Sequence, residues 1–203
     1  MLIVGITGSL ATGKTTVAKM FKRYGAKILD ADQMAHQALD SNRQCFLSIV
    51  RYFGKEILDG KRIDRKKLAD IVFEDPKKLK KLVSIIHPVV VKEIRAQVTQ
   101  LKKSKKSGVL VLDVPLLIEA GLHKWVDFLI VVKAGQKKQV ERAVKGKNIA
   151  SQQAVQRIKS QMPLSEKIKL ADIVIDNNKS LTETRRQVSA IWARLRKSQT
   201  SQN

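Results

Sequence analysis

The sequence predicts an α/β fold with a doubly wound, mostly parallel sheet, because short apolar runs alternate with helical patterns along the chain. Five of these runs have the length and composition of buried strands. They are residues 2–6, 26–29, 109–112, 128–132 and 173–175. A chain of 203 residues usually forms one domain, so we expect a single domain over residues 1–203 that can carry an inserted lobe.

The first predicted strand leads into Gly8-Ser9-Leu10-Ala11-Thr12-Gly13-Lys14-Thr15, which fits the phosphate-binding pattern G-x-x-x-x-G-K-[ST]. Glycines allow backbone N–H groups to converge on an anion, Lys14 adds a mobile positive charge, and Thr15 offers a hydroxyl to Mg²⁺. We expect residues 14–23 to form a helix whose N-terminal dipole also attracts the anion. A glycine-rich turn with an exposed lysine is the alternative, which the flanking strand and helix disfavour.

Carboxylates follow two of the predicted strands. The second strand ends at Asp30-Ala31-Asp32, on the sheet edge that also carries the phosphate loop. Two carboxylates beside an anion site indicate that a cation or a hydroxyl group is handled there, although one of them can simply cap a helix. His36 shares a face with Asp32 if a helix begins here. Asp113 ends the third strand, where it can hold Mg²⁺ through water, contact a substrate or cap a turn.

Residues 33–107 show helical periodicity and no convincing strand. This pattern predicts a helical insertion, large enough to be a second lobe that covers a substrate. Within it, Pro76 suits the first turn of a helix, whereas Pro88 predicts that His87 does not lie at a helix centre.

Residues 139–165 are predicted to form a lid, because basic residues surround a helix break at Gly146 and such segments close over phosphates in kinases. Arg142 and Arg157 are its candidate phosphate ligands. A solvated pair of cationic helices accounts for the charge equally well. Ser180 and Glu183 form a capping box at the start of the last helix.

The composition favours an anionic partner. Lys and Arg number 40 against 18 Asp and Glu, so the formal net charge of +22 attracts nucleic acid or any other polyanion. Only 4% of the residues are aromatic, which leaves few stacking platforms and disfavours nucleic acid. Cys45 is the single cysteine, and no apolar run reaches membrane-spanning length, so we expect a cytoplasmic protein with no membrane partner.

Phosphoryl transfer to a hydroxyl requires neutralised phosphate oxygens and a carboxylate that positions the acceptor and takes its proton. Lys14, Mg²⁺ bound at Thr15, and Asp32 supply these parts in the sequence. A phosphate loop alone also serves switches, motors and transporters, so the remaining motifs must decide between these classes.

The chain resembles the dephospho-coenzyme A kinase family over nearly its whole length. The resemblance rests on motifs that occur in the family's order: Gly5-Ile6-Thr7-Gly8 leading to Gly13-Lys14-Thr15-Thr16, Asp30-Ala31-Asp32 with Ala35-His36, His87-Pro88, residues 113–122, Gln139 with Arg142, Arg157-Ile158, Gln161-Met162-Pro163, Lys167, Ala171-Asp172 and Ile175-Asp176-Asn177.

The resemblance implies a P-loop nucleoside-kinase-like three-layer αβα fold with a helical substrate lobe and a lid. It implies ATP-dependent phosphorylation of the ribose 3′-hydroxyl of dephospho-coenzyme A, with Mg²⁺, in the last step of coenzyme A synthesis. Asp32 resembles the general base, while Lys14 and Arg142 resemble the groups that stabilise the moving phosphoryl. The implied ATP-binding residues are Gly8, Ala11, Thr12, Gly13, Lys14, Thr15 and Thr16. The implied substrate-binding residues are Asp32, His36, His87, Asp113, Pro115 and Leu116.

The sequence departs from the family pattern at several positions. Ser9 and Ala11 stand where glycines are common, and the methyl group of Ala11 is tolerable if its φ is negative. Gly146 and Val91 replace arginines, with lysines beside them at 145, 147 and 92, and lysine lacks the bidentate fork of arginine. Another small-molecule or nucleoside monophosphate kinase, and a nucleic-acid-binding P-loop protein, remain the alternatives. The sequence leaves the oligomeric state open, with a monomer favoured.

Overall fold

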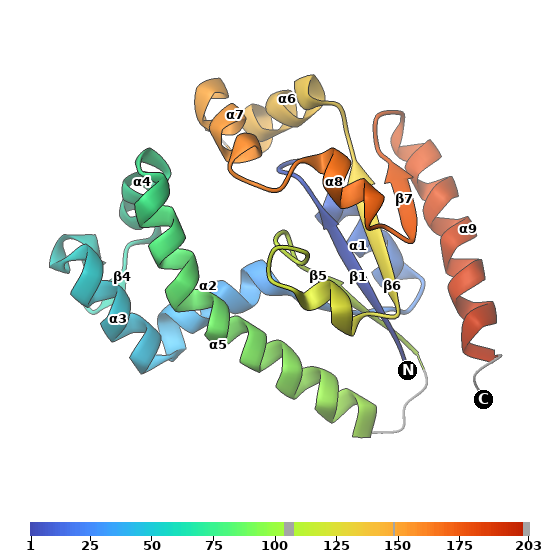
Figure 1. The fold of residues 1–203 in the computed structure, drawn as a ribbon, viewed down its shortest axis with the longest axis horizontal. Coiled ribbons are helices and arrows are strands. Elements are labelled where there is room, and N and C mark those ends of the chain that lie inside the picture. The colour runs from blue at the N-terminus through green and yellow to red at the C-terminus, as the bar shows by residue number, and fades with distance from the viewer. Residues whose placement is uncertain (104–107, 148, 201–203) are drawn as a thin grey trace. The chain divides into compact units, whose positions relative to one another are not determined.

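The computed structural model of the protein describes residues 1–103, 108–147 and 149–200 (Figure 1). They form two compact units. The first comprises Met1–Asp30 with the described residues after position 107, and the second comprises Ala31–Lys103. Residues 104–107 of the predicted insertion, and residue 148 of the predicted lid, lie outside the described residues, as does the side chain of Lys147.

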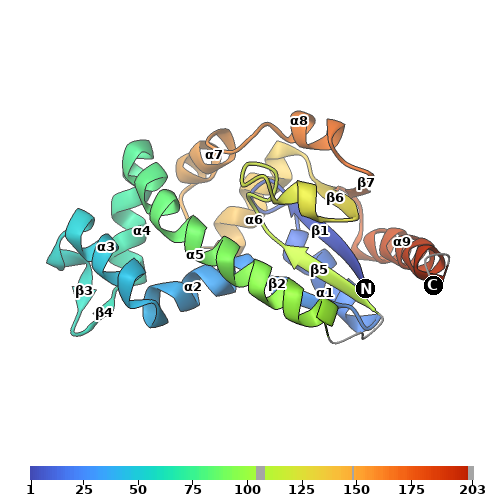
Figure 2. The same cartoon turned by 60° about the horizontal axis from the view of Figure 1, so that its bottom comes forward.

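The first unit is built on a five-stranded sheet in the order β2-β5-β1-β6-β7, in which every neighbouring pair is parallel (Figure 2). The strands are β1 Leu2–Gly8, β2 Lys27–Asp30, β5 Val109–Asp113, β6 Phe128–Lys133 and β7 Ile173–Asp176. All five predicted strands are confirmed, as is the α/β class with a parallel sheet. In the register, Asp113 lies opposite Ile6 on one side and Asp30 on the other, so the strands end together at one edge.

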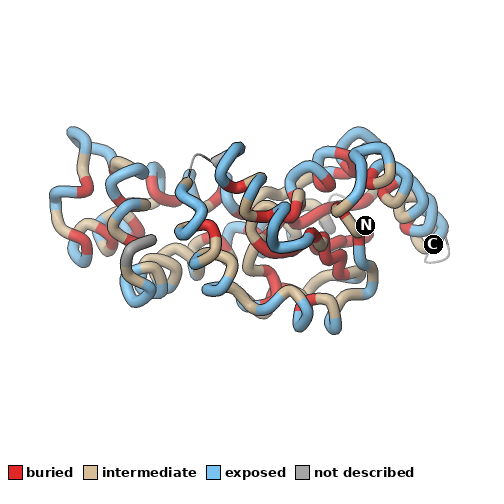
Figure 3. Tube along the Cα trace, turned by 90° about the horizontal axis from the view of Figure 1, so that it is seen from above, coloured by how far each residue is buried: buried red, intermediate tan, exposed pale blue. Residues whose placement is uncertain are grey.

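Helices cover the sheet because its strands are apolar on both faces. One face packs against α1 (Lys14–Arg23) and α9 (Leu181–Thr200), whose residues Phe21 and Val188 belong to the main core. On the other face, the segment after β5 packs so closely that a Cβ at Gly5 would lie 2.9 Å from Leu117 Cδ1. The helices α6 (Gln136–Lys147), α7 (Ser151–Lys159) and α8 (Leu164–Lys169) lie between β6 and β7 in the chain. The strands carry many of the buried residues in Figure 3.

The second unit has its own hydrophobic core. Its elements are α2 Ala31–Ser41, α3 Arg43–Phe53, the 3-10 turn Lys55–Ile57, β3 Leu58–Asp59, β4 Arg62–Ile63, α4 Arg65–Glu74 and α5 Pro76–Lys103. The antiparallel hairpin of β3 and β4 corrects the expectation that this stretch holds no strand. Gly60, with φ 58°, forms its turn. Strands of two residues are too short to give an alternating pattern, which is why the sequence did not reveal them.

Pro88 does not interrupt α5, and the prediction that His87 avoids a helix centre is wrong. The helix runs unbroken for 28 residues with Pro88 inside it. An internal proline costs about 3 kcal/mol. Ile85, Ile86 and Val89, on either side of it, pack partly buried against the core of this unit, and burial of an apolar side chain is worth up to about 2 kcal/mol, so packing of the helix within its unit offsets the cost. Similarly, α6 continues through Gly146 to Lys147, so the predicted break at Gly146 is also wrong.

No helix in the described ranges combines the length and the apolar composition that a membrane span needs.

Candidate active site

The phosphate loop joins β1 to α1, and its glycines are required by space and by backbone conformation. Gly13 has φ 95° and immediately precedes α1. A Cβ added there would lie 2.0 Å from Nδ2 of Asn177, and one added at Gly8 would lie 2.6 Å from the carbonyl oxygen of Val132. Neither neighbour is a flexible chain end in open space, so any side chain at these positions would displace the loop.

Ala11 adopts φ 54°, so the expectation of a tolerable negative φ does not hold. The left-handed region costs a residue with a Cβ about 1 kcal/mol, and such strain concentrates at functional loops. Two hydrogen bonds close the turn around Ala11, because the hydroxyl and the backbone N–H of Thr12 both donate to the carbonyl of Ser9, at 3.0 and 3.4 Å. The strained residue is therefore held by its neighbours.

Lys14 forms a buried ion pair with Asp113. The Nζ to Oδ1 distance is 2.5 Å, and both side chains are almost completely buried. Because Asp113 ends β5 beside β1, the pair fixes the loop lysine at the carboxyl edge of the sheet. One oxygen of Asp113 is therefore engaged by the ammonium group of Lys14, and its predicted role as a water-mediated Mg²⁺ ligand stays a prediction.

Asn177 and Arg142 both contact the phosphate loop at the backbone carbonyl of Thr12. The side-chain amide of Asn177, which directly follows β7, donates to the carbonyl of Thr12 at 2.8 Å and accepts from the hydroxyl of Thr184 at 2.8 Å. The guanidinium of Arg142 donates to the carbonyl of Asn177 at 2.9 Å and to that of Thr12 at 3.5 Å. Arg142 thus lies against the Thr12–Gly13 peptide, where it supports the loop.

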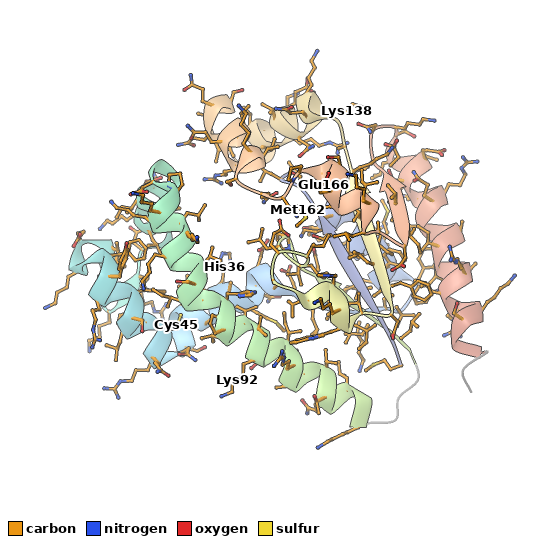
Figure 4. All side chains as sticks on the ribbon, in the orientation of Figure 1. His36, Cys45, Lys92, Lys138, Met162 and Glu166 are labelled. Carbon is orange, nitrogen blue, oxygen red and sulfur yellow. The ribbon has the colours of Figure 1, made fainter. Side chains whose placement is uncertain are left out.

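The segment after α7 is also attached to the loop. Gln161 Oε1 accepts a hydrogen bond from the backbone N–H of Leu10 at 3.1 Å. Met162, which lies between α7 and α8 (Figure 4), donates its backbone N–H to Glu119 at 3.2 Å. Lys167 on α8 reaches the carbonyls of Gly8 and Pro115. These contacts were not foreseen, because the sequence marked these residues only through the family resemblance.

The pKa values of Arg157 and Asp176 in this unit are shifted. Burial lowers the pKa of the Arg157 guanidinium on α7. Burial would raise the pKa of Asp176, but hydrogen bonds from Asn178 and the ion pair with Lys133 lower it overall. Asp176 therefore stays ionised beside Asn177 and fixes the turn that places Asn177.

The remaining predicted site residues lie on other elements. Asp30 ends β2, and Asp32 follows in the first turn of α2. His36 is four residues further along the same helix, so the predicted helical spacing of Asp32 and His36 is confirmed, and both are exposed. His87 lies within α5, where its Nε2 is buried without a hydrogen-bond partner among the described residues. Pro115 and Leu116 lie in the half-buried turn after β5.

A divalent ion at the phosphate loop would be bound mainly by the phosphates of the nucleotide and by few protein oxygens. The described residues include no cluster of three or more acidic, histidine or cysteine side chains that could cage a metal. Thr15 is exposed in the first turn of α1, beside Thr16, and offers the kind of hard oxygen that Mg²⁺ prefers. Mg²⁺ commonly binds through one or two protein oxygens and substrate phosphates, and Thr15 suits that arrangement.

A phosphate loop on a parallel sheet, with a paired lysine at the carboxyl edge, defines a P-loop α/β fold. The fold is shared with a shikimate kinase from Acinetobacter baumannii, at a TM-score of 0.56 and 16% identity over 98% of this chain and 94% of that one. The dephospho-CoA kinase family model (CoaE) matches residues 2–183, and the chain belongs to that family.

Individual dephospho-CoA kinases are similar to this chain over nearly its whole length. It is 43% identical to a dephospho-CoA kinase of Aquifex aeolicus, covering 95% of this chain and 96% of that protein. It is 42% identical to one of Carboxydothermus hydrogenoformans, covering 93% and 92%. The solved dephospho-CoA kinase of Campylobacter jejuni is 28% identical and superposes with a TM-score of 0.70, covering 97% of this chain and 98% of that one.

Proposed function

We propose that the protein is a dephospho-CoA kinase, which transfers the γ-phosphoryl group of ATP to the ribose 3′-hydroxyl of dephospho-coenzyme A and releases coenzyme A and ADP. The observation that carries the proposal is the complete phosphate loop, with Lys14 paired to Asp113, in a chain whose family match extends over residues 2–183. This reaction is the last step of coenzyme A synthesis.

The loop binds the donor. Backbone N–H groups around Gly13 and the N-terminus of α1 receive the β- and γ-phosphates of ATP, and Lys14 adds its charge there. Thr15 would hold Mg²⁺, which would supply positive charge that neutralises the phosphate oxygens. Asp113 keeps Lys14 in place before ATP arrives and shares it with the phosphates afterwards. Removal of Mg²⁺ with EDTA is expected to abolish turnover.

Asp32 prepares the acceptor. It follows Asp30, which pairs with Asp113 at the carboxyl edge, by only two residues. Asp32 orients the 3′-hydroxyl and takes its proton as the bond to the γ-phosphoryl forms. His36, His87, Pro115 and Leu116 contact dephospho-coenzyme A. The lid region 139–165 closes over the donor with Arg157, while Arg142 of the same region stabilises the phosphoryl group from beside the Thr12–Gly13 peptide that it contacts. We expect the protein to act on ATP and dephospho-coenzyme A in the cytoplasm.

A coupled assay for ADP release tests the function. Purified protein with Mg-ATP is expected to release ADP when dephospho-coenzyme A is added, and to remain nearly silent with AMP, nucleosides or shikimate as acceptors. Equal rates with a nucleoside monophosphate would replace the proposal with the alternative kinase class. Stimulation of ATP hydrolysis by nucleic acid at physiological salt would favour the nucleic-acid-binding class.

The role of Asp32 is tested by Asp32→Asn, which keeps the shape and removes the base. We expect kcat to fall by about 100-fold or more. Asp70→Asn, an exposed substitution on α4 in the same unit, is the matched control and should keep wild-type turnover. Near-normal turnover of Asp32→Asn would remove Asp32 from the mechanism.

A further inference from the structure

A completely buried lysine lies at the start of the phosphate loop. The side chain of Lys167 on α8 is 0% exposed. Lys169, two residues further along the same helix, is 70% exposed. Burial of an ammonium group has a large desolvation cost, and a hydrophobic residue of similar volume often makes such a site more stable. The buried charge at position 167 is therefore weak evidence for a role in stability.

The ammonium group of Lys167 has three hydrogen-bond acceptors, one for each of its N–H groups. Nζ lies 3.1 Å from the carbonyl oxygen of Pro115 and 3.5 Å from that of Gly8. It also lies 2.9 Å from Oε1 of Glu119, whose side chain is 24% exposed. A neutral side chain of this length could not donate three hydrogen bonds, so the cation is matched to the site.

The two carbonyls belong to the two strand ends that build the nucleotide site. Gly8 is the last residue of β1 and the first of the phosphate loop, while Pro115 follows Asp113, the partner of Lys14, by two residues. The hydroxyl of Thr7 donates to the same Pro115 carbonyl at 2.9 Å. Lys167 therefore links the loop entrance to the segment that holds the loop lysine.

We propose that Lys167 is a positioning residue for nucleotide binding, whose ammonium group holds the Gly8 and Pro115 carbonyls and so keeps the phosphate loop open to ATP. The contact with the Gly8 carbonyl fixes the backbone at the loop entrance, ahead of the N–H groups around Gly13 that would receive the phosphates. Lys167 acts through the loop and touches neither substrate. This inference deepens the proposed function and rests on the nucleotide half of the site alone.

The test compares Lys167→Met, which preserves length and removes the charge, with Lys169→Met on the exposed side of α8. Titration calorimetry with MgADP, without acceptor, measures the affinity, and thermal melting monitors the fold. We expect Lys167→Met to bind MgADP about tenfold or more weakly, because the Gly8 carbonyl at the loop entrance loses the Lys167 donor and the Pro115 carbonyl keeps only the Thr7 hydroxyl. Its melting temperature should fall, because Glu119 loses its ion-pair partner, but a cooperative transition well above the titration temperature shows that the fold persists. Lys169→Met should match the wild type in both measurements.

A second variant separates the carbonyl contacts from the loss of the ion pair. Lys167→Met combined with Glu119→Gln removes the carboxylate that the single substitution leaves without its partner, and it should bind MgADP as weakly as Lys167→Met. Recovery of affinity in the double variant would overturn the proposal, since the unpaired Glu119 would then explain the loss. An MgADP affinity of Lys167→Met within about twofold of wild type would overturn it as well.

Kinetics distinguish this inference from the proposed function. Lys167→Met should raise KM for ATP more than KM for dephospho-coenzyme A, because Gly8 belongs to the phosphate loop, whereas the carbonyl of Pro115, a proposed acceptor contact, keeps its hydrogen bond from Thr7. Equal increases in both constants would contradict a role confined to the nucleotide site. Wild-type protein that binds MgADP but does not phosphorylate dephospho-coenzyme A would refute the proposed function and leave the role of Lys167 standing.

Discussion

Replacement of Asn177 by alanine should loosen the phosphate loop without removing any group that binds phosphate. Asn177 makes two buried side-chain hydrogen bonds, one to the Thr12 carbonyl and one from the Thr184 hydroxyl, both at 2.8 Å. Both partners keep a weaker contact, because Arg142 lies 3.5 Å from the Thr12 carbonyl and the Thr184 hydroxyl lies 3.3 Å from the Ser180 carbonyl. The loss is therefore close to that of two ordinary hydrogen bonds and a small cavity.

These contacts set the expected magnitude. Two hydrogen bonds of about 1 kcal/mol each, with the cavity left by the amide, give a destabilisation of about 2–3 kcal/mol. For a chain of this size, about 2–4 °C of melting temperature correspond to each kcal/mol. The transition of the unit that contains the sheet should therefore move down by about 4–12 °C.

Calorimetric melting measures the shift, and hydrogen exchange of the peptide that contains residues 8–15 measures the loop directly. Exchange of the loop amides should accelerate in Asn177→Ala and stay unchanged in Lys179→Ala, an exposed substitution two residues away. A shift below about 1 °C with wild-type loop exchange would show that Asn177 does not hold the loop, and would refute the reasoning from its contacts.

Three further predictions follow from single residues. Gly13→Ala should abolish MgADP binding in a calorimetric titration, since φ 95° disfavours a Cβ and the new atom would lie 2.0 Å from Asn177; measurable wild-type affinity would contradict this. Burial raises the pKa of the Cys45 thiol, so iodoacetamide should label Cys45 much more slowly in the native protein than in urea at the same pH, and equal rates would refute its burial. Backbone hydrogen bonds from Lys67 and Lys66 lower the pKa of Asp64, the N-cap of α4, so the stabilisation that the Asp64 carboxylate gives should be lost as the pH falls through that lowered pKa. Between about pH 5 and about pH 2, circular dichroism should show a smaller loss of helix in Asp64→Asn than in the wild type. Identical acid curves for the two proteins would count against the cap.

The strands of the sheet could be predicted because the apolar composition of each one is visible in a few consecutive residues. A strand buried on both faces must be apolar at every position, so β1 and β5 appear in the sequence as continuous runs. The β3–β4 hairpin has no such signature, because each of its strands has two residues. The prediction that His87 does not lie at a helix centre failed because it rested on a local preference alone. The preference of Pro88 against a helix interior is outweighed by packing along the 28-residue helix α5.

The phosphate loop was predictable from eight consecutive residues, but the groups that hold it were not. Lys14 meets Asp113 across 99 residues, Gly8 meets Lys167 across 159, and Thr12 meets Asn177 across 165. A pattern over consecutive residues contains no information about such pairs. The positive φ of Ala11 was missed likewise, because it depends on how the turn from Ser9 to Thr12 closes.

These distant partners explain how a strained loop can stay ready for a nucleotide. Ala11 and Gly13 both have positive φ, and a free loop would relax toward commoner conformations. Lys167 holds its first residue, Gln161 its third, and Asn177 with Arg142 the peptide before α1. Each contact comes from an element after β6, the part of the chain that also contains the predicted lid. Substitutions of these contact residues should therefore weaken nucleotide binding even though they touch no phosphate.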